Sequence, residues 1–96
     1  MKVIPLKGSS VNAHQQITVQ LGDNLLEFNV NYLQSGQWAV DISREGVELI
    51  SGAMLEPNAD LTQVFQPLGL GRLIFTGADT TLDNLGSDNR LTWIEP

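Results

Sequence analysis

The chain has 96 residues, 42% of them hydrophobic and 17% charged, which predicts one folded, soluble domain over residues 1–96, and no apolar run is long enough to cross a membrane. Eleven acidic residues against five scattered basic ones give a net charge of −6, so nucleic acid and anionic membranes are disfavoured as partners. Cysteine is absent, which excludes disulfides, thiolate catalysis and cysteine-ligated metal centres.

Alternating apolar and polar residues dominate the first half of the chain and predict antiparallel strands. An amino-terminal segment, residues 1–14, precedes them, and it is apolar enough at 3–6 to pair along a sheet edge in this chain or in a neighbour. Each of the three turns between the strands contains a glycine, which tolerates the positive φ of tight hairpins. A four-stranded meander is therefore predicted, with strands over residues 17–21, 26–32, 38–42 and 47–50.

The second half of the chain is less regular. Asp60 is placed to cap a short helix over residues 61–66, which Pro67 would end. A fifth strand is expected over 72–76 and a last one over 90–94. Between them, residues 79–89 are rich in Asp, Asn, Thr and Gly, and we expect an ordered loop held in place by Leu82 and Leu85.

These elements predict a mainly β fold, a small closed or nearly closed antiparallel barrel with one short helix between strands four and five. A sandwich of two sheets is the alternative. Three isoleucines, Ile50, Ile74 and Ile94, lie on the opposite parity from the expected core residues. We therefore expect the helix or a partner protein to cover them.

The sequence predicts no catalytic, cofactor-binding or metal site. The single histidine, His14, is interpreted as a surface residue. The loop acids Asp79, Asp83 and Asp88 are oxygen ligands of the kind calcium prefers, but Asp and Asn also populate turns by bonding their own backbone, and this interpretation is preferred. Whether that loop binds a cation stays open.

One expected strand face is polar. Glu27 and Asp41 share it, which would suit a pair of catalytic carboxylates, but acidic residues at outward strand positions ordinarily keep a sheet soluble. A hydrogen-bonding surface for another protein is the preferred interpretation, because four amide side chains are expected on the same face: Gln20, Asn29, Asn31 and Gln37.

Several short runs stand out over nearly the whole chain: Ile4-Pro5-Leu6, Trp38-Ala39-Val40-Asp41-Ile42, Gly46, Ser51-Gly52-Ala53-Met54-Leu55, Ala59-Asp60-Leu61, Leu68-Gly69-Leu70-Gly71, Asn84-Leu85-Gly86 and Leu91-Thr92-Trp93. In their order and spacing, these runs resemble the baseplate plug proteins of contractile-tailed phages.

The resemblance implies a small barrel similar to an OB fold, made in the host cytoplasm and built into the virion as a structural subunit without a cofactor. It places the chain at the centre of the tail baseplate. The implied partners are baseplate hub and tail tube proteins and further copies of the chain itself, with three and six copies both open.

Contacts with partners are expected from the segment Val3, Ile4, Pro5 and Leu6, and from Arg72. The rival hypothesis is an OB-like binding module for an oligonucleotide or carbohydrate, with a small hydrolase as a remote third. A single-strand binder needs exposed aromatic residues beside basic ones, whereas Tyr32, Trp38 and Trp93 have inward parity. Trp38 is expected in the core, and Asp41 is expected to bond turn backbone on the opposite face.

Overall fold

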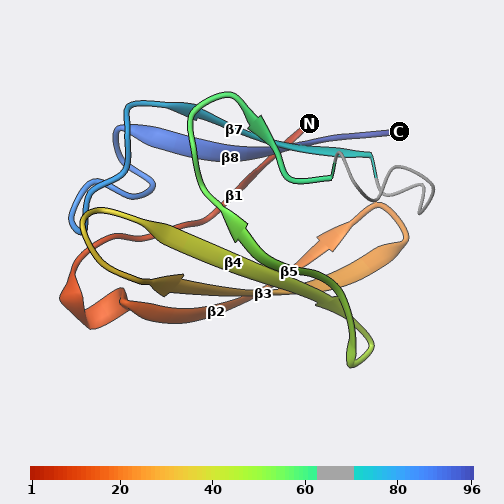
Figure 1. Cartoon of the computed structure of the whole chain (residues 1–96). Coiled ribbons are helices and arrows are strands. Elements are labelled where there is room, and N and C mark those ends of the chain that lie inside the picture. Colours follow the sequence, from red (N-terminus) through yellow and green to blue (C-terminus); the bar gives the residue numbers. More distant parts are fainter. Residues whose placement is uncertain (63–70) are drawn as a thin grey trace.

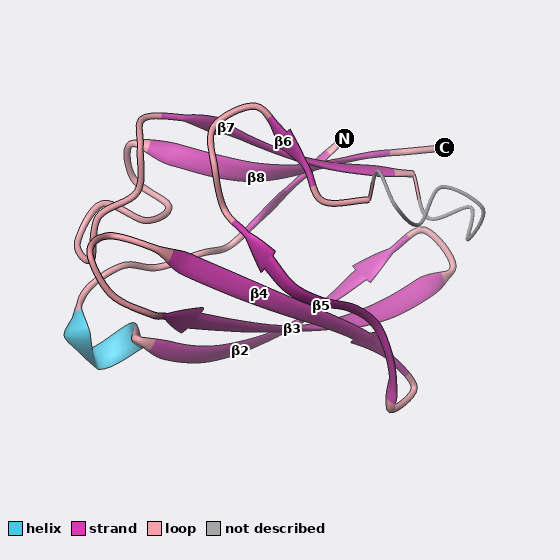
Figure 2. Cartoon of the chain, in the orientation of Figure 1, coloured by secondary structure: helices cyan, strands magenta, loops and turns pink. Residues whose placement is uncertain are grey.

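The computed structural model describes residues 1–62 and 71–96, and it consists of two four-stranded antiparallel sheets, one above the other (Figure 1). The first sheet has the order β2-β3-β4-β5, and its strands are His14–Leu21, Asn24–Tyr32, Trp38–Arg44 and Val47–Met54. The second has the order β1-β8-β7-β6, and its strands are Lys2–Ile4, Asn89–Ile94, Arg72–Gly77 and Ala59–Asp60. A turn of 3-10 helix, Ser10–Asn12, precedes β2 (Figure 2).

The first sheet confirms the predicted meander, since its four strands pair in chain order. Leu21 pairs with Asn24 and Arg44 pairs with Val47, so two of the three hairpins have two-residue turns. In the second of these, Glu45 and Gly46 both have positive φ, 53° and 79°. A turn of that kind matches the right-handed twist of the strands it joins.

Strand β5 is longer and less regular than predicted. It runs on to Met54, and its pairing with β4 shifts register between Val40 and Ser43. A shift of one residue turns side chains to the other face of a sheet. Ile50 therefore points inward opposite Ile42 and is buried, so the prediction that it belongs to an outer apolar patch is wrong.

The core fills the space between the sheets with alternate residues of every long strand. Its largest members, Trp38, Phe28 and Phe75, are fully buried. The Trp38 ring meets Tyr32 edge to face, and its Nε1 donates to the Thr81 carbonyl oxygen at 2.9 Å. Such a bond satisfies the one polar atom of a buried tryptophan. The predicted core role of Trp38 is confirmed.

The loop between β7 and β8 lies at the end of the molecule where the amino-terminal segment leads into β2 (Figure 1). Leu85 is buried and Leu82 packs against the core, as predicted. Asn84 accepts a bond from the Thr81 backbone N–H and donates to the Asp79 carbonyl oxygen, while Asn89 donates to the Ala78 carbonyl oxygen. These asparagines therefore serve the loop's own backbone, which is the role preferred from the sequence.

The predicted closed barrel is wrong, because the two sheets do not join into one. On one side the chain passes from β5 to β6, from one sheet to the other. On the other side the edge strands β1 and β2 share no backbone ladder. Side chains bridge them instead: Lys2 Nζ donates to the Gln20 carbonyl oxygen at 3.0 Å, and Gln15 bonds the backbone of Lys7. Two facing sheets, the alternative from the sequence, describe the fold.

The predicted helix over residues 61–66 falls mostly outside the described residues. Its first two positions, Leu61 and Thr62, form a turn, and 63–66 are not described. Asp60 does accept a hydrogen bond from a backbone N–H two residues later, as a capping residue would: its Oδ1 accepts from the Thr62 N–H at 2.9 Å. Within the described part of the chain, no helix has the length and apolarity to cross a membrane.

Candidate protein-interaction surfaces

The outer face of the β1-β8-β7-β6 sheet combines apolar and basic side chains. Cross-strand pairing aligns Val3, Thr92, Ile74 and Asp60 in one row across the four strands. In the next row, Arg72 pairs with Ile94. Val3 is 52% exposed and Ile94 38%. We call this surface the outer arginine face; its residues are Val3, Asp60, Arg72, Ile74, Thr76, Arg90, Thr92 and Ile94.

Two of the five predicted contact residues, Val3 and Arg72, come together on this face although 69 positions separate them in the chain. Pro5 is exposed just beyond β1. Ile4 and Leu6 have the other parity and are buried in the core. The edge pairing expected for this segment occurs within the chain, between β1 and β8.

Arg72 is held at the rim of the face by Asp60. Its Nε lies 3.1 Å from Asp60 Oδ2, while Asp60 Oδ1 accepts bonds from the N–H and hydroxyl of Thr62 at 2.9 and 2.6 Å. Partial burial raises the pKa of the Asp60 carboxyl, but the Thr62 bonds and Arg72 outweigh it, so the pKa lies below its ordinary value. Asp60 is thus held as an anion that orients the guanidinium.

The outer face of the β2-β3-β4-β5 sheet is polar, as predicted. Register aligns Gln16, Asn29 and Asp41 in one row, and Thr18, Glu27 and Ser43 in the next. Gln20 and Asn31 lie on the same face by parity, whereas Gln37 lies outside the strands, in the loop between β3 and β4.

Glu27 and Asp41, the two carboxylates that the sequence pattern singled out on this face, are engaged with neighbouring groups. Asn29 Nδ2 donates to Glu27 Oε1 at 3.4 Å, and Asp41 Oδ1 accepts from the Gly52 N–H at 2.6 Å. Asp41 was expected to bond turn backbone, but Gly52 belongs to the irregular part of β5. The two side chains are held by separate partners, an arrangement that suits a hydrogen-bonding surface rather than acid–base chemistry.

A groove of about 430 Å³ runs between the amino-terminal segment and β2, with Pro5 and Lys7 on one side and Gln16, Ile17 and Thr18 on the other. It lies where a closed barrel would pair β1 with β2. Gln15 closes one end, because its side chain bonds both the N–H and the carbonyl oxygen of Lys7. No sequence motif predicts this groove. Alternation along β2 predicts which of its side chains point outward, but it does not predict which segment lies beside the strand.

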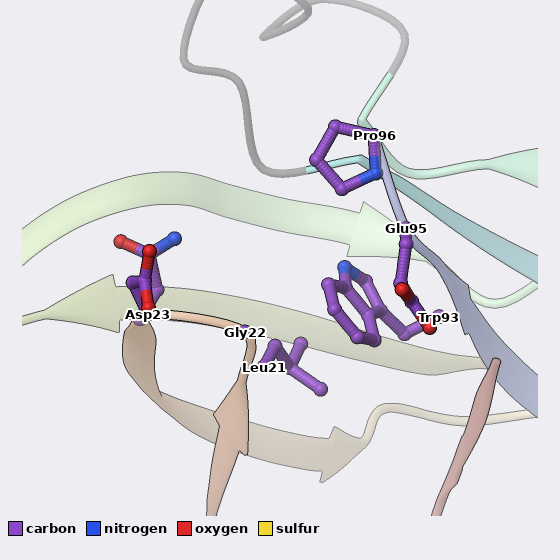
Figure 3. Close-up of a pocket in the computed structure, with 7 residues that line it drawn as sticks. Leu21, Gly22, Asp23, Trp93, Glu95 and Pro96 are labelled. Atoms are coloured by element: carbon purple, nitrogen blue, oxygen red, sulfur yellow. The ribbon is translucent and has the colours of Figure 1, made fainter.

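A second hollow, of about 260 Å³, lies between the β2–β3 turn and the carboxyl end of β8 (Figure 3). Figure 3 shows the Trp93 indole and Leu21 in its wall, with Asp23 on the turn opposite Glu95 and Pro96. Glu95 bonds the amino terminus of Met1 at 3.0 Å. The lining has one apolar wall and two acidic side chains, Asp23 and Glu95. Among the residues that the structure describes, it contains no nucleophile or base that could act together with them.

The remaining sequence candidates are ordinary surface features. His14 lies exposed at the start of β2, with Nδ1 2.8 Å from Asn31 Oδ1. In the described residues, no three acidic or histidine side chains are grouped closely enough to hold a metal ion. The functional candidates are surfaces. Ile74 and Ile94 were expected on an outer face from their parity, whereas Thr92 and Arg90 were missed. Parity relative to Trp93 would have placed those two on the same face, but only the pairing of β1 with β8 brings Thr92 beside Val3.

A comparison with curated proteins found no match. A family model described as "Cyanophage baseplate Pam3 plug gp18" matches residues 1–96, the whole sequence given, and confirms the resemblance seen in the sequence. The chain therefore belongs to the cyanophage baseplate plug family, as a structural component of the virion and not as an enzyme.

Proposed function

We propose that the chain acts by protein–protein packing at the centre of the tail baseplate, beside the hub and tail tube proteins. Several identical copies, three or six, would stand around the tail axis, since closed symmetry is the rule for such assemblies. The outer arginine face is the contact surface in this proposal.

The observation that carries the proposal is the composition of that face. Exposed apolar side chains, Val3 and Ile94, lie among two arginines, Arg72 and Arg90, on the outer face of the sheet. The centre of a protein interface has more apolar area than its rim and is enriched in arginine, and both kinds of side chain lose their water there. Asp60 fixes one guanidinium in advance, which lowers the entropy lost when a partner orders that side chain.

The test uses a phage that lacks this gene and receives it from a plasmid. Val3→Asp places a charge on the outer arginine face, and Val47→Asp, the matched control, places one on a valine of β5 that is somewhat more exposed, at 63% against 52%. We expect Val3→Asp to reduce the amount of the chain in purified tails, and Val47→Asp to leave it unchanged. Equal incorporation of both variants would overturn the assignment of this face.

A cryo-electron map of wild-type tails tests the rest of the proposal. It is expected to show the outer arginine face buried against another protein, and to give the copy number directly. A map in which that face is solvated and the polar face is buried would contradict the assignment.

A further inference from the structure

We propose that the outer edge of β2 accepts a short extended segment of a neighbouring baseplate protein, which adds one strand to the β2-β3-β4-β5 sheet. This inference rests on the proposed function, because it names the way in which the chain binds one of its neighbours. It concerns an edge of the molecule and not the outer arginine face.

The backbone of β2 is open along this edge. Ala13 accepts a bond from the Tyr32 N–H, toward β3, whereas the Gln20 carbonyl oxygen accepts from Lys2 Nζ, on the side away from β3. Backbone groups alternate between the two sides of an antiparallel strand. Gln16 and Thr18 therefore direct their N–H and carbonyl groups outward, and these groups have no bond to any residue in 1–62 or 71–96.

The other sheet edges in the described residues are protected, and β2 is not. Strand β1 has three residues and is followed by Pro5, and β6 has two residues. Strand β5 is irregular, and its Gly52 N–H is already held by Asp41. Short strands, prolines and irregular pairing are the usual protection against added strands. Strand β2 has eight regularly paired residues, without proline, lysine or an acid.

The groove beside this edge gives the incoming segment a place for its side chains. In an added strand, alternate side chains point to opposite faces. Those beside Ile17 would enter the groove toward Ile17 and Pro5, which are apolar. Those beside Gln16 and Thr18 would join the polar outer face. The fitting segment is therefore short, with an apolar residue between polar ones.

Charge argues for a separate protein and against a second copy. Lys2 lies at the Gln20 end of the open edge, and Lys7 lies at the Gln15 end. An antiparallel pair of two β2 strands would bring Lys2 of each copy toward Lys7 of the other, and like charges across strands are destabilising. A segment with acidic residues at its ends would meet both lysines favourably.

The first experiment blocks the edge without breaking the sheet. The Thr18 N–H points outward, so Thr18→Pro removes an edge donor and leaves the ladder to β3 intact. Thr18→Ala is the matched control, which keeps the donor. In the phage complementation assay, we expect about tenfold or greater loss of Thr18→Pro from purified tails, the effect of losing one or two bonds at an interface, with Thr18→Ala retained. The inference would be overturned by a Thr18→Pro variant that has the wild-type unfolding temperature and also enters tails at the wild-type level.

The second experiment uses only the wild-type chain, so it tests the inference even if the Thr18→Pro variant does not fold. Deuterium exchange of the Gln16 and Thr18 amides is measured in the free wild-type chain and in wild-type tails. We expect slower exchange in tails; equal exchange would overturn the inference, and so would a free dimer in which the same amides are protected. Wild-type chain absent from tails would instead refute the proposed function, so the two failures are distinguishable.

Discussion

The side chain of Gln15 bonds the backbone of Lys7 in both directions: its Nε2 donates to the Lys7 carbonyl oxygen at 2.7 Å, and its Oε1 accepts from the Lys7 N–H at 3.1 Å. The amide thus takes the place that a backbone residue of a neighbouring strand would occupy. It ties the amino-terminal segment to β2 without extending the sheet, and it leaves the rest of the β2 edge open.

Gln15→Ala is expected to loosen the amino-terminal segment. The change removes both bonds to Lys7 and a third to the Asn12 carbonyl oxygen, so we expect a loss of about 1–2 kcal/mol in the free energy of unfolding. Gln16→Ala, on the exposed side of the same strand, is the control and should change stability by about 0.5 kcal/mol or less. Urea unfolding measures both. Equal losses for the two variants would show that the Gln15 bonds contribute nothing.

Two adjacent residues of β1 lie on opposite faces of the sheet, one in the core and one on the surface. Ile4 is 1% exposed and Val3 is 52% exposed. We expect Ile4→Ala to destabilise the domain by about 2–5 kcal/mol, because it leaves a cavity, and Val3→Ala by about 0.5 kcal/mol or less. Deletion of residues 1–6 should therefore lower the unfolding temperature markedly. A truncated chain as stable as the full one would show that β1 is not needed by the core.

Gly86 combines a positive φ, 83°, with a close approach to the Leu6 carbonyl oxygen, against which an added Cβ would clash. Gly46 has nearly the same φ, 79°, but open space around it. Gly46→Ala should cost about 1–2 kcal/mol from backbone strain alone. Gly86→Ala should cost clearly more, because the amino-terminal segment must also shift. Denaturant unfolding of the two variants gives the difference, and equal costs would argue against the close packing of Leu6 on this loop.

Asp60 makes stability depend on pH in the acidic range. Its pKa is lower in the folded chain than the ordinary value of 3.8, so its stabilising contribution is complete above that ordinary value and is lost as pH falls through the folded pKa. Asp60→Asn keeps an oxygen for the Thr62 bonds and removes the charge. The difference in unfolding free energy between wild type and this variant should be about 1 kcal/mol or less, because Arg72 is half exposed to water.

The measurement is urea unfolding of both proteins from pH 7 to pH 3. The stability advantage of the wild type is expected to be constant near neutral pH and to shrink below about pH 4, as the Asp60 carboxylate takes up a proton. An advantage that is the same at pH 3 and at pH 7 would contradict the role of the charge.

Local pattern in the sequence determined the longer strands, the two short hairpins and the inward side chains. It did not predict β6, where Asp60 was expected to cap a helix. Alternation placed Trp38, Phe28 and Phe75 inward because strand side chains alternate between faces wherever pairing is regular. The asparagine-rich loop was predictable for a similar reason, since its side chains bond backbone only a few residues away. Where pairing shifts by one residue, as at Ile50, the same rule gave the wrong face.

The tertiary structure alone decided how the strands assemble into sheets. Alternation states which face of a strand is buried and says nothing about which edge meets which, so a barrel and two facing sheets have the same pattern. The choice depends on contacts such as Lys2 with Gln20 and Gln15 with Lys7, between residues 18 and 8 positions apart that no motif links. The pairing of β1 with β8 brings Val3 beside Thr92, and because β1 does not pair with β2, the β2 edge is left open. Both candidate surfaces depend on this arrangement.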